Sequence, residues 1–252
     1  MLVNKMINAD FHVHTFYCDG KDSPEDIVNE AISRGMKKLG FSGHAYTSFD
    51  DACMSPDGTR EYINEINRLK RKYEGQIKIL LGTECDYFSE INPSDYDYII
   101  GSVHYVYQDG KYLSVDHTPE FFTCLIHACN DDPYEACEKY YALVADVVNK
   151  TQADIIGHFD LVTKFNERYI NATNKALDAL LKTGKPFEIN TGAISRGWRT
   201  FPYPSRRILE YIAANGGSVI LSSDSHQKET LMYKFDECEK LVEDLGLKAV
   251  LL

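Results

Sequence analysis

The feature that most constrains the fold of this chain is a repeated alternation of short apolar strands with amphipathic helices. Seven segments are predicted as strands from their apolar runs and from the turn residues that bound them. These strands are residues 6–14, 38–44, 76–81, 98–104, 153–158, 187–190 and 218–222. Repeated β-then-α units predict parallel strands joined by right-handed crossovers. The pattern therefore predicts an α/β fold, either a closed barrel or a doubly wound open sheet.

Helices are predicted from cap residues and from apolar positions at helical spacing. The predicted helices are residues 23–35, 59–73, 134–150, 174–183, 204–215 and 234–245. Segment 105–133 is predicted as an irregular insertion with a short helix around 120–129, and 248–252 as a terminal strand. Since no linker or internal repeat is visible, we expect residues 1–252 to form one domain.

Charge and cysteine content bound the possible partners. The net charge of −11 disfavours a surface that binds nucleic acid. No apolar run approaches the length of a membrane span, and the first residues show no secretory signal. The seven cysteines are scattered without a CxxC spacing. We therefore expect a cytoplasmic protein, and the formal charge leaves room for a small phosphorylated substrate if bound cations neutralise the carboxylates.

Metal-ligating side chains recur where the predicted strands end. Six of the eight histidines lie at or just beyond such an end: His12, His14, His44, His104, His158 and His226. Glu84 and Asp224 lie at equivalent positions. A single histidine of this kind is often a hydrogen-bonded interior residue, but that reading does not explain the whole set. Because the carboxyl ends of parallel strands face one side of the sheet, these residues predict one shared site.

The chemistry of this set indicates divalent metal ions. Imidazoles and carboxylates without cysteine suit Zn, Fe or Mn. With Asp19 added there are nine potential ligands, more than one ion needs, and Glu84 is suited to bridge two ions. Asp19 precedes Gly20, so it also fits a turn without any metal. Two or three closely spaced ions lower the pKa of a shared water and stabilise both oxygens of an in-line displacement, which favours phosphoester hydrolysis.

Six short motifs, in order along nearly the whole chain, resemble those of the polymerase-and-histidinol-phosphatase (PHP) superfamily. They are DFHVHT at 10–15, FSGHA at 41–45, GTECDY at 82–87, IGSVH at 100–104, GHFD at 157–160 and SDSH at 223–226. Within the superfamily the chain is similar to the histidinol-phosphate phosphatases. The resemblance implies a distorted, TIM-like (β/α)7 barrel with a trinuclear metal site at the carboxyl ends of the strands.

The resemblance also implies how the ligands are shared among three ions. One ion would take His12, His14, Glu84 and Asp224, a second Glu84, His104 and His158, and a third Asp19, His44 and His226. Asp224 and His226 would act in catalysis together with Arg196, which matches the family's arginine in its segment.

Cationic side chains are predicted to bind the phosphate. Arg196 has a guanidinium that suits a phosphate dianion, and Lys164 is a second candidate. Thr163 stands where family members often carry an arginine, and Arg199 could compensate for that change. Gly43 replaces a frequent acidic residue, so support of the neighbouring histidine is expected to differ.

Two further residues near the predicted site have alternative interpretations. Asp160 could orient His158 or meet a substrate ammonium group. Trp198 could line the pocket or pack in the core.

The function expected from these features is metal-dependent hydrolysis of a small phosphomonoester, foremost L-histidinol phosphate. A related phosphoesterase acting on nucleotides, oligonucleotides or phosphotyrosine is the nearest alternative. A metal-binding regulatory module without catalysis is an alternative of another class, and it would predict broken ligand positions, of which the chain shows none.

Overall fold

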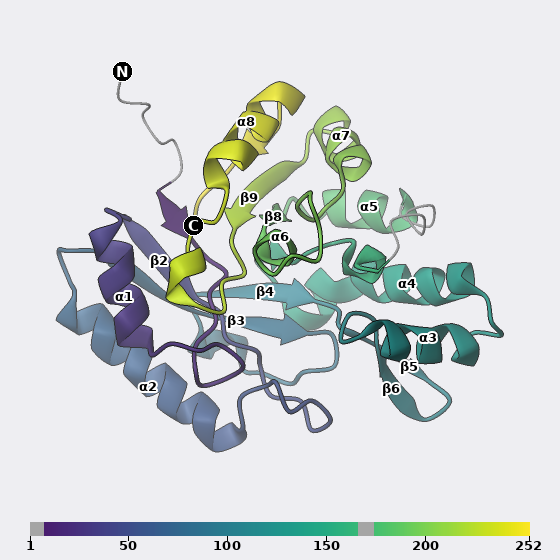
Figure 1. Cartoon of the computed structure of the whole chain (residues 1–252), viewed down its shortest axis with the longest axis horizontal. Coiled ribbons are helices and arrows are strands. Elements are labelled where there is room, and N and C mark those ends of the chain that lie inside the picture. The colour runs from purple at the N-terminus through teal and green to yellow at the C-terminus, as the bar shows by residue number, and fades with distance from the viewer. Residues whose placement is uncertain (1–7, 166–173) are drawn as a thin grey trace.

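The computed structural model describes residues 8–165 and 174–252, and its centre is a parallel sheet of eight strands (Figure 1). The sheet order is β1-β2-β3-β4-β7-β8-β9-β10. The bounds are β1 Ala9–Asp10, β2 Lys38–Phe41, β3 Lys78–Asp86, β4 Tyr98–Ser102, β7 Ile155–Ile156, β8 Phe187–Asn190, β9 Ser218–Ser222 and β10 Lys248–Ala249. The sheet curls until Val13, just past β1, bridges Ser225, just past β9. The fold is therefore a distorted TIM-like α/β barrel, as predicted.

Helices cover the outer face of the curled sheet (Figure 1). The described helices of the chain are α1 Pro24–Ser33, α2 Pro56–Lys72, α3 Pro119–Ala128, α4 Pro133–Thr151, α5 Asn174–Leu181, α6 Gly192–Ser195, α7 Arg206–Ala214 and α8 Phe235–Leu245, with short 3₁₀ turns η1 Pro93–Asp95, η2 Leu161–Thr163 and η4 Lys228–Thr230. Of these, α3 packs against α4 and against residues 105–114, and α6 lies at the carboxyl ends of the sheet strands. Within the described residues, no helix has both the length and the apolar character that crossing a membrane requires.

Two predicted boundaries differ from the structure for local reasons. The first strand, predicted over 6–14, is paired as a strand only at Ala9–Asp10, and Met6 and Ile7 lie outside the described residues. Beyond Asp10 the chain bonds to loops instead. Helix α2 begins at Pro56, three residues before the predicted start, because Ser55 accepts a hydrogen bond from Gly58 N (3.0 Å) and proline suits the first helical position.

The prediction that the insertion begins irregularly was wrong. Strands β5 Tyr105–Gln108 and β6 Lys111–Ser114 form an antiparallel hairpin, and α3 follows where the short helix was predicted. The turn residues Asp109 and Gly110 both have positive φ (51° and 77°), as a two-residue hairpin turn requires. An Asp-Gly pair between alternating aromatic residues is a recognised hairpin signal, and the sequence contained it.

The amino-terminal half of the barrel interior is apolar and closed. A fully buried cluster of Phe11, Tyr98, Ile100, Ile155 and Ile220 fills it, and the Tyr98 hydroxyl donates to the carbonyl of Phe11 (2.6 Å). Because this end of the barrel is filled, the polar residues occupy the other end, where the strands finish.

Candidate metal centre

Glu84, inside β3, lies at the centre of the predicted ligands. Its Oε2 is 3.1 Å from His12 Nε2 and 3.1 Å from His44 Nδ1. Its Oε1 is 2.8 Å from His158 Nε2 and 3.3 Å from His104 Nε2. The two oxygens of one buried carboxylate thus face two different pairs of histidines, which is the arrangement a bridging ligand needs.

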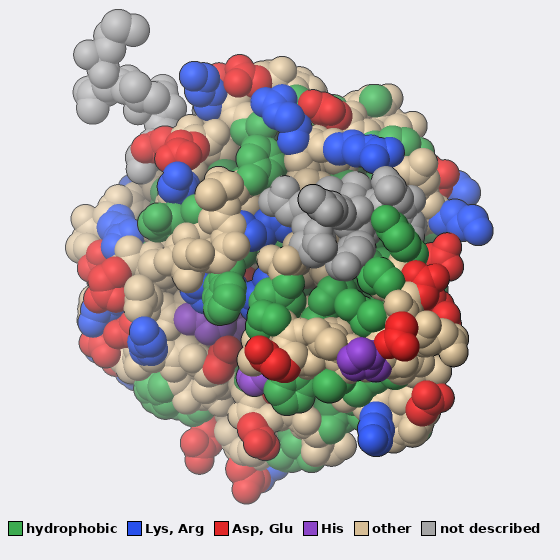
Figure 2. All heavy atoms as spheres, turned by 45° about the vertical axis from the view of Figure 1, so that its right-hand side comes forward, with side chains coloured by type: hydrophobic (Ala, Val, Ile, Leu, Met, Phe, Trp, Pro, Cys, Tyr) green, Lys and Arg blue, Asp and Glu red, His purple; other side chains and the backbone are tan. Residues whose placement is uncertain are grey.

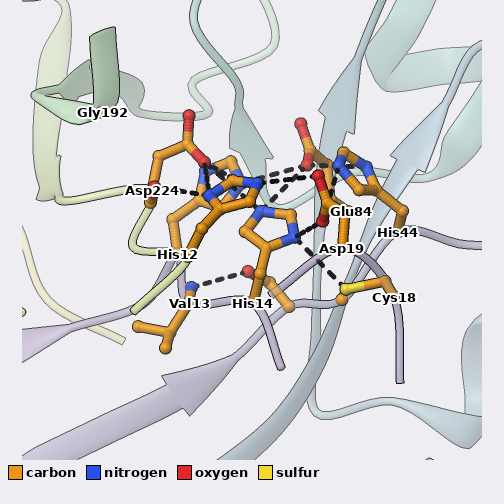
Figure 3. Close-up of polar contacts among 12 residues, drawn as sticks. His12, Val13, His14, Cys18, Asp19, His44, Glu84, Gly192 and Asp224 are labelled. Carbon is orange, nitrogen blue, oxygen red and sulfur yellow. Dashed lines mark hydrogen bonds and ion pairs between the residues drawn. The ribbon is translucent and has the colours of Figure 1, made fainter. Parts of the chain in front are cut away.

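The remaining predicted ligands close the site on the side of β1 and β9. Asp224 Oδ1 lies 3.4 Å from His14 Nε2 and 3.8 Å from His12 Nε2. His226 Nε2 lies 3.0 Å from Asp19 Oδ2, and the His226 ring stacks on that of His14 at 4.1 Å. Figure 3 shows the rings of His12 and His14 between the carboxylates of Asp224 and Glu84. All nine predicted ligands therefore come together at one place.

The parallel sheet brings these residues together although they are far apart in sequence. Register aligns Glu84 with Ile100 across β3 and β4, and His44 forms a bridge to Glu84 just beyond β2. Each ligand sits where its strand ends or in the following loop. The site thus occupies the carboxyl ends of the strands, the usual location in barrels of this kind.

The donor set fits divalent cations. His14 Nε2 is completely buried and has no hydrogen-bond partner among the described residues, yet two carboxylate oxygens lie 3.4 and 3.5 Å from it. Two ligand atoms that share one cation at about 2 Å each have a similar spacing. Three groups of ligand atoms each lie within 4.8 Å of one another: His14, Asp19, His44 and His226; His12, His14 and Glu84; and His44, Glu84 and His104. A cation placed among such atoms would satisfy the buried nitrogen, and imidazole with carboxylate suits Zn, Fe or Mn.

The protonation of the ligands follows from this crowding. Burial would raise the pKa of Glu84, but the charges of His12 and His44 hold it well below its ordinary value. Burial would lower the pKa of His12, but the neighbouring Glu188 and Glu84 raise it well above 6.5. Burial, His226 and His44 lower the pKa of His14 to about 3. His14 is therefore neutral and ready to bind metal, whereas His12 must lose a proton first.

Two carboxylates that the sequence reasoning did not assign support the histidine ligands. Glu188, buried inside β8, accepts a hydrogen bond from His12 Nδ1 (2.5 Å) and one from the backbone N–H of His158 (2.9 Å). Asp86, the last residue of β3, accepts from the backbone N–H of His104 (2.7 Å) and lies 3.3 Å from its Nδ1. A carboxylate on the second ring nitrogen orients an imidazole and makes it a stronger ligand. The signal for Glu188 was a charged residue inside an apolar strand.

A cavity of about 200 Å³ opens over the ligands, and two of the predicted cations line it. Arg196 is held by Asp224, with Nη1 3.0 Å from the backbone oxygen and Nη2 3.0 Å from Oδ2. Lys164 donates to the backbone oxygen of Asp116 (2.6 Å), which also lines the cavity. Figure 2 shows histidine and basic side chains together in a hollow of this face.

Arg199 and Trp198 lie differently from Arg196. The Arg199 side chain is buried behind the cavity wall, donates to Thr163 Oγ1 (2.7 Å) and stacks on the ring of Tyr203 at 4.4 Å. Trp198 is half exposed (51%), with Lys164 Nζ 5.3 Å from its ring, so it does not pack in the core.

Asp160 is fully buried and accepts a hydrogen bond from the backbone N–H of Ser205 (3.0 Å). The described carboxylates that contact His158 are Glu188, which accepts from its backbone N–H (2.9 Å), and Glu84, which lies 2.8 Å from its Nε2. The expectation that Asp160 orients His158 is therefore not borne out by any hydrogen bond among the described residues.

The chain is similar in sequence and fold to known proteins. The family model described as PHP domain matches residues 10–192. The histidinol-phosphatase of Lactococcus lactis is 28% identical, over 96% of this chain and 92% of that protein. The histidinol-phosphatase of Bacillus subtilis is 25% identical, over 92% of this chain and 98% of that protein.

Solved structures share the fold. The Lactococcus lactis histidinol phosphate phosphatase, crystallised with Zn, L-histidinol and phosphate, matches with a TM-score of 0.73 at 24% identity, covering 96% of this chain and 95% of that one. The Listeria monocytogenes protein hisK matches with a TM-score of 0.80 at 20% identity, covering 91% of this chain and 99% of that one.

Proposed function

The chain belongs to the PHP domain family, and on this premise we propose that it is a metal-dependent phosphatase that hydrolyses L-histidinol phosphate to L-histidinol and phosphate, a step of histidine biosynthesis. The observation that carries the proposal is the meeting of nine metal-ligating side chains, seven of which line one small cavity together with Arg196. Relatives of similar length named histidinol-phosphatase support the choice of substrate.

The proposed ligand sets follow the order of the motifs. His12, His14, Glu84 and Asp224 hold one ion, Glu84, His104 and His158 a second, and Asp19, His44 and His226 a third. Bound divalent ions supply Lewis-acid polarisation of the phosphate and an activated water near neutral pH. Glu84 is the shared ligand because each of its oxygens already faces a different pair of histidines. Glu188 and Asp86 hold His12 and His104 in position.

Arg196 is the proposed phosphate-binding residue. Burial would lower its pKa, but the charge of Asp224 raises it, so the guanidinium stays charged. Its two bonds to Asp224 fix its orientation before substrate arrives. A fixed guanidinium can bind non-bridging phosphate oxygens and stabilise the charge that develops on them during hydrolysis. Lys164, held by Asp116 at the same cavity, is a second proposed contact.

The size and charge of the site favour a small substrate over the alternatives. A cavity of about 200 Å³ accommodates a small phosphomonoester, whereas an oligonucleotide requires an extended basic groove with stacking aromatics. The carboxylate of Asp116 at the cavity wall also suits a substrate that carries a cationic group beside its phosphate. The net charge of −11 is a further reason against a polyanionic substrate.

A substrate panel with the metal-loaded protein tests this function. Rates are measured for L-histidinol phosphate, a nucleoside monophosphate, phosphotyrosine and a short oligonucleotide, at controlled zinc or manganese content. We expect kcat/KM for L-histidinol phosphate to exceed the others by about 100-fold or more. A flat profile, or a preference for nucleotides or phosphotyrosine, would contradict the proposal.

Two histidine variants provide the matched control for that panel. His104→Ala removes a proposed ligand and should abolish most activity, whereas His127→Ala changes an exposed histidine on α3 and should leave it intact. Equal activity of the two variants, with equal metal content, would exclude the proposed metal centre.

We also propose the cytoplasm as the compartment of this reaction. All seven cysteines are free thiols in the structure, and free thiols suit a reducing compartment.

A further inference from the structure

The line along which the barrel closes contains a buried carboxylate that the proposed chemistry does not use. This seam runs between β1 and β9, which are not paired as strands. It is closed at the site end by two backbone hydrogen bonds, from His14 N to Ser225 O (2.8 Å) and from Ser225 N to His12 O (3.0 Å). Asp10, the last residue of β1, lies beside these bonds and is completely buried.

The proposed ligands of the first ion come from both sides of this seam. His12 and His14 follow β1, and Asp224 follows β9. Across the seam, their relative position depends on the few bonds that join the two sides, because β1 and β9 are not paired with each other as strands. A displacement of a few tenths of an ångström between the sides would change the fit of a cation.

Asp10 joins the two sides through its carboxylate. Oδ1 accepts from the backbone N–H of Ser223 (3.1 Å), the residue before Asp224, and from that of His12 (3.4 Å). Oδ2 accepts from the backbone N–H of Met232 (2.9 Å), in the loop that follows β9. One side chain thus contacts the backbone of one proposed ligand and the residue next to another, across the seam.

Asp224 needs such support because its own backbone is strained. It adopts φ of +50°, a left-handed conformation that non-glycine residues seldom take without surrounding restraint. The Asp224 side chain is also packed closely against the backbone of Gly192, because a Cβ atom built on Gly192 would lie 2.7 Å from Asp224 Oδ2. The bond from Ser223 N to Asp10 restrains the peptide between Ser222 and Ser223, one residue before this strained residue.

We propose that Asp10 is a positioning residue of the metal centre, which holds His12 and Asp224 at the spacing that the first ion requires. The inference rests on the proposed metal centre. A buried carboxylate is an unfavourable way merely to close a seam, since apolar residues of similar size close barrels without the cost of removing a charge from water. Its three backbone hydrogen bonds satisfy it at the place where the ligand set must be held together.

The test compares Asp10→Asn with wild type through metal binding alone. The amide has the same shape but only one acceptor atom, so the hydrogen bonds of one of the two Asp10 oxygens are lost. Zinc affinity is measured by competition with a chromophoric chelator at a temperature well below unfolding. We expect the affinity of Asp10→Asn to fall about 10- to 100-fold, the range seen when support of metal ligands is removed.

Asp97→Asn is the control, at an exposed carboxylate that also pairs with Lys70. Asp97 also accepts a strand N–H, that of Leu81 (2.8 Å), but at the opposite end of the strands. Both variants are expected to lower the melting temperature of the metal-free protein. If Asp10 positions the ligands, its replacement also reduces the rise in melting temperature that zinc produces. We expect this reduction in Asp10→Asn and not in Asp97→Asn.

Two measurements on Asp10→Asn, its zinc affinity and its zinc-induced rise in melting temperature, decide whether Asp10 positions the ligands. If Asp10→Asn binds zinc with wild-type affinity and shows the full zinc-induced rise, Asp10 only stabilises the fold and the proposal is wrong. If Asp10→Asn cannot be recovered folded, Asp10→Glu, which keeps the charge but displaces it by one methylene, is judged by the same two measurements. Failure of the underlying metal centre is distinct, because wild type itself would then not bind zinc in this assay.

Discussion

At the scale of single residues, the main feature of the site is that a few buried carboxylates contact many histidines. Glu84 faces four histidines, and Glu188 supports His12 from behind. In the absence of metal, burial acts to lower the pKa of His12 and His104 but the carboxylates raise it, whereas the pKa of His14 is lowered to about 3 and this histidine is neutral. The titration behaviour of the metal-free protein therefore reports on the geometry of the site.

The metal-free protein should lose stability as pH rises above about 6.5. Burial opposes a raised pKa at His12, His104 and His226, but their carboxylate partners raise it at all three. Above the pKa of an unfolded histidine the folded state then binds more protons, so stability falls as pH rises through the folded values. His14, whose pKa is lowered to about 3, changes the stability with pH only below about pH 6.5.

Urea unfolding of chelator-treated protein between about pH 6.5 and 8.5 measures this effect. Zinc should reverse the trend, because metal binding requires deprotonated imidazoles and strengthens with pH. Rising stability of the metal-free protein across this range would contradict the assigned protonation.

The two arginines near the site are expected to have different roles. Arg196 lines the cavity, so Arg196→Lys should lower kcat/KM by about 10²- to 10³-fold through loss of paired donors. Arg199 is buried behind Tyr203, so Arg199→Lys should lower stability and leave KM nearly unchanged. Steady-state kinetics and thermal unfolding of both variants separate the two roles. A large rise in KM for Arg199→Lys would restore it as a direct phosphate contact.

At the scale of elements, glycines on two neighbouring strands make room for one buried ring. Tyr98 of β4 packs over Gly40 of β2 and Gly82 of β3, and a Cβ on Gly82 would lie 2.3 Å from the ring. The single proton of the Tyr98 hydroxyl is shared between the backbone oxygens of Phe11 (2.6 Å) and Phe41 (3.0 Å). The glycines are thus required by close packing and not by an unusual φ.

Gly82→Ala is expected to destabilise the protein by about 1–3 kcal/mol, because the ring of Tyr98 cannot move without breaking its hydrogen bonds. Chemical denaturation measures the change. Gly75→Ala is not a neutral comparison, since Gly75 has φ of +81°. Glu74→Ala, at an exposed turn residue just beyond α2, is expected to have little effect. An unchanged midpoint for Gly82→Ala would mean that the strands can separate locally.

At the scale of the whole molecule, bound metal is expected to be a large part of the stability. Carboxylates and imidazoles from most of the barrel strands converge on one place, and cations would join these strands at the site end. Removing metal with a chelator should lower the melting temperature by about 10 °C, since free metal about 1,000-fold above Kd contributes about 4 kcal/mol. Calorimetry with and without added zinc checks this. Equal melting temperatures would show that no metal is bound in the folded state.

The sequence alone determined the fold class and the identity of the predicted ligands. Strand and helix periodicity are local, and the ligands stand at strand ends, which a parallel sheet always brings to one side. Nine predicted ligands met for that reason. The hairpin at 105–114 also had a local signal, in Asp109-Gly110, and could have been found.

The tertiary structure alone decided what supports the ligands. Glu188 reaches His12 across 176 positions of sequence, and Asp10 reaches Ser223 across 213. Both bonds depend on the curvature that closes the sheet. A charged residue inside a short strand marks Glu188 as unusual, but no local pattern predicts its distant partner. The burial of Arg199 has the same origin, since the packing of Tyr203 decides which arginine lines the cavity. Local periodicity specifies which residues lie at the strand ends, and long-range packing specifies how firmly each is held there.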